Sequence, residues 1–124
     1  MRRHLLVVTL LIAGFAAPAW AAPRMNAAIF LAKADSLRRR GPLALFSSDL
    51  KVLQAQAETA GDELKAEHDA AKRAGRPLTY CPPNRKILGP QELLDGLHRI
   101  PAPELARLDI KQAMHVVLVR NYPC

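Results

Sequence analysis

Residues 80–124 read YCPPNRKILGPQELLDGLHRIPAPELARLDIKQAMHVVLVRNYPC and hold both cysteines of the 124-residue chain, Cys81 and Cys124. Two short amphipathic segments lie between them, separated by a proline-containing break at residues 100–103. A bond between the two thiols would close a loop of 44 residues, counted from 81 through 124. The chain-entropy model gives such a closure about 4 kcal/mol of stability. This stretch predicts a helical unit whose end is tied back to its own beginning.

The first 21 residues have the pattern of a secretory signal peptide. A basic start precedes an apolar run over residues 5–17, and a small-x-small pattern predicts cleavage between Ala21 and Ala22. The apolar run has 13 residues, whereas a membrane-spanning helix needs about 20; an uncleaved anchor is the alternative. We expect residues 22–124 to form one domain in the periplasm, without a membrane span.

Export favours a disulfide, because the periplasm is oxidising. Two free thiols, or a metal pair completed by histidine, are the alternatives. Neither cysteine, however, has a Cys-x-x-Cys partner or a histidine within five residues. The acidic cluster at residues 63–69, which includes His68, also has one carboxylate pair at metal-ligand spacing, but exposed helices carry such runs routinely. We expect a Cys81–Cys124 disulfide, no metal and no cofactor.

The predicted mature chain is basic. Once Arg2 and Arg3 leave with the signal, 16 Lys and Arg stand against 11 Asp and Glu, a net charge of +5 (16 − 11). Such a surface can meet nucleic acid, anionic lipid or an acidic protein, or can simply be solvated. Export argues against nucleic acid. The three arginines at 38–40 fall in the last turn of a predicted helix, where cations favour the helix dipole; docking of an acidic partner is the alternative role.

Hydrophobic periodicity predicts an all-α fold, a small single-domain bundle of four to five helices. A first helix spans residues 26–40, and a compact apolar turn at 42–46 follows it. The longest segment, 49–74, carries a narrow alanine-rich stripe, and Gly61 within it would mark a bend or a boundary between two helices. We expect three large side chains of the apolar turn to be buried: Leu43, Leu45 and Phe46.

The C-terminal half predicts a helix opened by Gly89-Pro90, a loose turn at 103–108 and a last helix over 110–121. A strand at 116–119 competes with that last helix. We expect the long segment 49–74 to be the spine on which the two C-terminal helices pack.

No catalytic constellation is present in the sequence. Nucleophilic catalysis needs a nucleophile, a base and an orienting group within reach. His68, His98 and His115 are scattered, and no serine lies in a sharp glycine turn. We therefore expect that the protein is not an enzyme.

Residues 79–124 resemble the C-terminal half of the Rap1a/Tai family of type VI secretion immunity proteins. The matching features are the entry Cys81-Pro82-Pro83, an amphipathic helix at 88–99, a proline-containing break and the end Tyr122-Pro123-Cys124. Family members often carry a further cysteine and a glycine-aromatic helix in the first half, and residues 25–76 show neither.

The resemblance implies an all-α fold, a disulfide and direct binding to a toxin in the periplasm, with a homodimer as a frequent state. We therefore expect an exported immunity-type protein that neutralises a toxin by binding it. A periplasmic stress chaperone, or a structural envelope protein, is the alternative.

Overall fold

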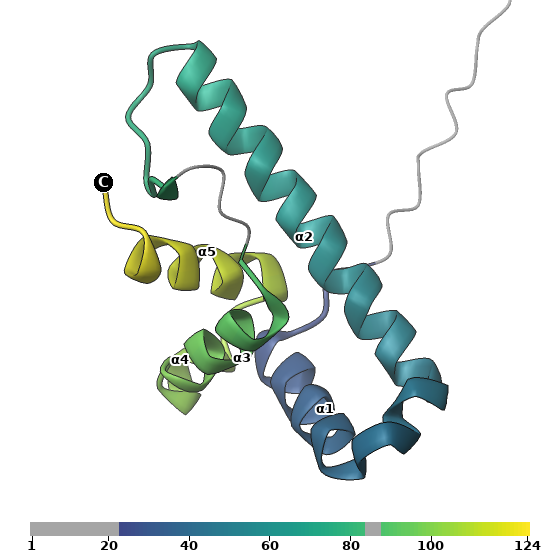
Figure 1. Cartoon of the computed structure of the whole chain (residues 1–124). Helices are drawn as coiled ribbons and strands as arrows, with labels where there is room; N and C mark the ends of the chain where they lie inside the picture. Colours follow the sequence, from purple (N-terminus) through teal and green to yellow (C-terminus); the bar gives the residue numbers. More distant parts are fainter. Residues whose placement is uncertain (1–22, 84–87) are drawn as a thin grey trace, which may run out of the picture.

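The computed structural model describes residues 23–83 and 88–124. The predicted signal peptide, with its cleavage point between Ala21 and Ala22, lies outside these residues. Within them, no β-strand forms and no helix is both long and apolar enough to cross a bilayer. The all-α prediction is confirmed (Figure 1), and the elements in order are α1 (Ala27–Arg40), the 3-10 helix η1 (Gly41–Phe46), α2 (Ser48–Arg73), α3 (Pro90–His98), α4 (Ala102–Leu105) and α5 (Ile110–Asn121).

The first helix begins and ends where local chemistry predicts. The side chain of Asn26 accepts hydrogen bonds from the backbone N–H groups of Ala28 and Ile29, at 2.9 and 3.2 Å. These bonds satisfy two of the donors that a helix start leaves free. At the other end Gly41 has a φ of +60°, which residues with a Cβ rarely adopt. The chain therefore turns sharply from α1 into η1.

The long helix α2 is continuous, so Gly61 does not separate two helices. Ser47 caps its start by accepting a hydrogen bond from the N–H of Asp49 at 3.2 Å. The predicted stripe faces inward: Leu53, Ala60 and Leu64 are buried, and Leu50, Ala57 and Ala71 are half-buried.

The C-terminal helices also follow their sequence signals. Asp109 and Gln112 form a capping box at the start of α5: the Asp109 carboxylate accepts from the N–H of Gln112 at 2.8 Å, and the Gln112 side chain accepts from the N–H of Asp109 at 2.9 Å. Residues 116–119 are helical, so the competing strand does not form. The predicted loose turn is α4, a single turn of four residues.

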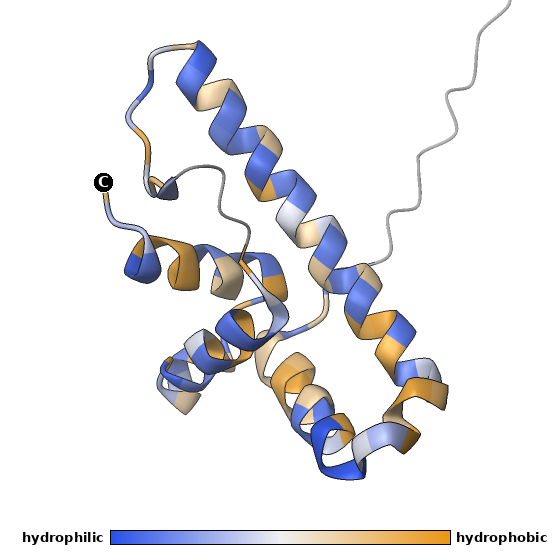
Figure 2. Cartoon of the chain, in the orientation of Figure 1, coloured by the Kyte–Doolittle hydropathy of each residue, from blue (hydrophilic) through white to orange (hydrophobic). Residues whose placement is uncertain are grey.

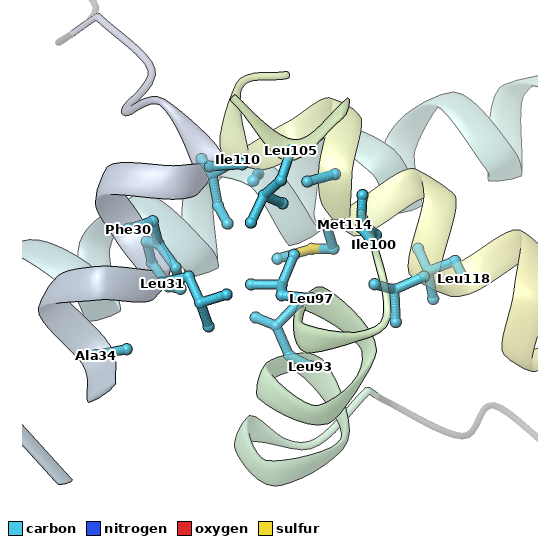
Figure 3. Close-up of a cluster of buried hydrophobic side chains, with 14 of the residues drawn as sticks. Phe30, Leu31, Ala34, Leu93, Leu97, Ile100, Leu105, Ile110, Met114 and Leu118 are labelled. Atoms are coloured by element: carbon cyan, nitrogen blue, oxygen red, sulfur yellow. The ribbon is translucent and has the colours of Figure 1, made fainter. Parts of the chain in front are cut away.

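The packing of the helices differs from the prediction in one respect. α5 packs on α2, as expected, but α3 packs on α1 and α5 instead (Figure 1). Periodicity identifies which face of a helix is buried but not which helix covers it. Here the apolar face of α3 is covered by α1 and α5 and not by α2. Figure 3 shows the result, a core in which Phe30 and Leu31 of α1 lie beside Leu93 and Leu97 of α3 and Met114 of α5.

The close contact between α3 and α5 depends on Gly96. A Cβ built at this position would lie 2.4 Å from Cγ1 of Val117, well inside van der Waals contact. Gly96 and Val117 are both buried, so neither residue can move toward solvent to relieve the overlap. The sequence signalled nothing special at Gly96.

The apolar turn between α1 and α2 is where the sequence prediction is wrong. Leu43, Leu45 and Phe46 are 73%, 72% and 89% exposed, respectively; we call these three residues the apolar corner. Only Ala44 of this turn packs against the core. So short a turn cannot present all its side chains to one core, and the smallest apolar one, Ala44, packs inward. Figure 2 shows this hydrophobic corner directly after the hydrophilic end of α1.

Candidate functional site

The two cysteines predicted to pair are joined in the structure. Cys81 and Cys124 form a disulfide with their Cα atoms 4.9 Å apart. Beside it, the N–H of Cys81 donates a hydrogen bond to the carbonyl of Tyr122 at 2.8 Å. The Tyr122 hydroxyl donates in turn to Glu92 of α3 at 2.9 Å. The chain end is therefore held both to the segment after α2 and to α3; we call residues 76–81 with 122–124 the disulfide end.

Tyr80 anchors the disulfide end to α2. Its side chain is buried, and its hydroxyl donates to the backbone carbonyl of Leu64 at 3.0 Å. Burial raises the pKa of the Tyr80 phenol, with smaller contributions from the negative charges of Glu67 and Asp69. The phenol stays protonated at neutral pH and keeps its role as a donor.

Two histidines from different helices meet at the Tyr80 ring. His68 of α2 stacks on it with ring centroids 4.7 Å apart, and His115 of α5 approaches its edge at 5.9 Å. The His115 ring nitrogen Nε2 also lies 2.8 Å from the hydroxyl of Thr79. The sequence presents these histidines as scattered. No local pattern could reveal the cluster, because its members come from three separate segments.

A hollow of about 200 Å³ opens over this cluster. Its lining includes two imidazoles, a carboxylate, a hydroxyl and a guanidinium, groups that can form hydrogen bonds with a side chain of another protein. We call it the disulfide-end hollow, and its lining residues are Leu64, Glu67, His68, Ala71, Arg76, Pro77, Leu78, Thr79, Tyr80 and His115.

The acidic cluster weighed as a metal site is used in ion pairs. Glu63 pairs with Arg24 and with Lys111, the latter at 3.3 Å, and Lys111 also pairs with Glu67. The hydrogen bond from Arg24 holds the pKa of Glu63 below its ordinary value, and Lys111 adds to the effect. These pairs connect the segment before α1, the middle of α2 and the start of α5. Among the described residues no group of three or more potential ligands could hold a metal ion.

The third histidine of the predicted mature chain lies apart from the hollow. His98, the last residue of α3, has its Nε2 3.0 Å from a carboxylate oxygen of Asp35 on α1. The structure thus brings together Cys81 with Cys124 and His68 with His115, and it leaves His98 as a link between α1 and α3.

Comparison of the chain with protein-family models, with curated proteins and with solved structures finds no match.

Proposed function

We propose that this protein is an exported, periplasmic binding protein of the immunity type, which neutralises a toxin by direct binding. One observation carries the proposal: the two cysteine-proline ends that resemble the Rap1a/Tai family are bonded together, with the disulfide-end hollow beside them. The disulfide also supports export, because such bonds persist in oxidising compartments.

The disulfide end is suited to binding because it is already ordered. Association costs free energy when loops and side chains must be immobilised, and a framework fixed beforehand avoids part of that cost. Here the framework is held by the disulfide, by the Cys81–Tyr122 backbone bond and by the Tyr80 hydroxyl. Arg76 is the exposed cation at the rim of the hollow, and arginine is among the residues that most often dominate an interface.

A protection assay tests the proposal. A toxin encoded beside the gene for this protein is directed to the periplasm of a host, with or without the protein, and survival is counted. We expect the wild-type protein to protect and to form a 1:1 or 2:2 complex with the toxin on size exclusion, the latter if it is a homodimer. Arg76→Glu should weaken the complex by about 2 kcal/mol, roughly thirtyfold.

The matched control is Arg107→Glu, the same charge reversal on an exposed arginine after α4, away from the hollow. This variant should protect as well as the wild type. Absence of protection by the wild-type protein would overturn the proposed function, and equal loss in both variants would remove the hollow as the binding surface.

A further inference from the structure

The apolar corner exposes three large side chains in adjacent positions. η1 is a 3-10 helix with about three residues per turn, so Leu43 and Phe46 fall on the same side of it. Leu45 lies next to them, and Phe46 is the most exposed large hydrophobic residue that the structure describes. Exposed apolar patches of this kind mark protein or membrane interaction sites.

The surroundings of the apolar corner are cationic. Arg38, Arg39 and Arg40 end α1 directly before η1, and all three are exposed. Lys51, on the first turns of α2, lines an open hollow of about 320 Å³ together with Leu45, Phe46 and two serines.

The acidic residues nearest to this surface in sequence are already paired. From residue 36 to residue 48 the chain contains no Asp or Glu. Asp49 lies 3.4 Å from the Lys33 ammonium, and Asp35 lies 3.0 Å from His98. The three arginines outnumber these two carboxylates, so the charge beside the apolar corner is net positive.

The shape of this region favours a bilayer over a protein partner. η1 forms the outer turn between α1 and α2, at the edge of the molecule away from the C-terminus (Figure 1). A protein would need a pocket that fits three projecting side chains and is bordered by carboxylates. A lipid surface accepts projecting apolar side chains at its acyl boundary and offers phosphates to the long arginine side chains at any position around them.

We propose that the apolar corner, with Arg38, Arg39 and Arg40, docks on the surface of a bilayer that contains anionic lipid. Leu43 and Phe46 enter the boundary between headgroups and acyl chains, and the arginines lie among the headgroup phosphates. This contact holds the protein at a membrane surface and goes beyond the proposed function, since it requires neither a toxin nor the disulfide-end hollow.

Vesicle co-sedimentation of the oxidised protein tests the proposal. The probes are phosphatidylcholine vesicles with or without phosphatidylglycerol. We expect binding to the anionic vesicles, weakening as salt is raised, and at most weak binding to pure phosphatidylcholine. Arg38→Gln, Arg39→Gln and Arg40→Gln should each lower the partition coefficient about fivefold, and Phe46→Ser should lower it about tenfold.

A triple variant at the opposite end of the molecule is the matched control. Lys72→Gln, Arg73→Gln and Arg120→Gln together remove the same charge as the three corner substitutions, from exposed positions at the ends of α2 and α5. This variant should keep most of the binding. Equal loss in this control and in a variant that combines Arg38→Gln, Arg39→Gln and Arg40→Gln would overturn the proposal, because net charge alone would then explain the association.

A reporter placed in the corner tests insertion directly. Trp20 is the only tryptophan of the chain and lies in the predicted signal peptide, so Phe46→Trp gives the mature protein a single indole. Its emission should shift to shorter wavelength with the anionic vesicles. Failure to bind the vesicles would contradict docking through the corner. Binding in which the emission does not shift and Phe46→Ser loses no affinity would contradict it as well. If a captured protein covers the corner instead, the lipid proposal is wrong.

Discussion

The disulfide end and the apolar corner are the two extremes of this molecule. At the disulfide end a covalent bond, a backbone hydrogen bond and a buried tyrosine hydroxyl hold the chain in place. At the corner three large apolar side chains remain in water, although the sequence predicts that they are buried. The disulfide and the hydrogen bonds that support it therefore lie at one end, and the three large exposed apolar side chains of the corner lie at the other. Substitutions at the two ends should separate folding from surface function.

Removal of the disulfide should have the largest effect on stability. Cys124→Ser opens a 44-residue loop, counted from 81 through 124, and should lower the free energy of unfolding by about 4 kcal/mol. In a domain of this size the melting temperature should fall by roughly 15 °C or more. Thermal melts under oxidising conditions measure this change, with the reduced wild type as the control that should melt with the variant. An unchanged melting curve would show that the bond does not hold the fold.

Two glycine substitutions should change the free energy of unfolding in opposite directions. Gly96→Ala places a Cβ 2.4 Å from Val117, and the forced shift should exceed the gain in helix propensity, for a net loss of about 1–2 kcal/mol. At Gly61 the nearest atom is the Met114 sulfur at 3.9 Å, an ordinary contact. Gly61→Ala should therefore stabilise the protein by up to about 1 kcal/mol. Urea unfolding compares the two, and equal effects would contradict the close packing of α3 on α5.

Removal of the Tyr80 hydroxyl should have a smaller effect on the free energy of unfolding. Tyr80→Phe removes the hydroxyl that donates to the Leu64 carbonyl at 3.0 Å and should cost about 1 kcal/mol, the net contribution of one buried hydrogen bond. Thr59→Val removes an exposed hydroxyl from α2 and is the control, with an expected change of less than about 0.5 kcal/mol. Urea unfolding that gave the same value for both variants would remove Tyr80 as an anchor.

The local signals in the sequence explain why much of the fold was predictable. Asn26 and Asp109 act as caps within a few residues of their own positions, so the helix boundaries can be read from the chain alone. The disulfide was also predictable, since a chain with a predicted signal peptide and two cysteines has one intramolecular pairing available.

What the sequence could not give depends on packing in space. The exposure of Phe46, the position of α3 against α1 and the close approach at Gly96 all depend on which elements become neighbours. The disulfide-end hollow could not be predicted for the same reason. His68, Tyr80 and His115 are brought together only by the crossing of α2 and α5 and by the disulfide end.

Acid should weaken the ion pair between Glu63 and Arg24, which joins two segments, and the pair between Lys65 and Asp69 within α2. Hydrogen bonds from Arg24 and Lys65 lower the pKa values of Glu63 and Asp69 below their ordinary 4.5 and 3.8. The stability these carboxylates contribute is therefore fully present above those ordinary values and is lost as the pH falls through the lower, folded-state values. Thermal melts from neutral pH down to about pH 3 should show a shallower loss for Glu63→Gln than for the wild type. Glu58→Gln, on an exposed position of the same helix, is the matched control; a wild-type slope in Glu63→Gln would contradict the role of this pair.

The free energy of unfolding of the oxidised Phe46→Ser variant tests most directly whether the apolar corner lies outside the folded core. We predict a value within about 0.5 kcal/mol of the wild type, because a side chain that is 89% exposed loses almost no burial on substitution. Phe30→Ala, at a phenylalanine that is 4% exposed, should lose about 3 kcal/mol or more in the same urea titration. A loss of that size in Phe46→Ser would contradict the account, since it would place the corner in the core and leave no apolar surface for a membrane.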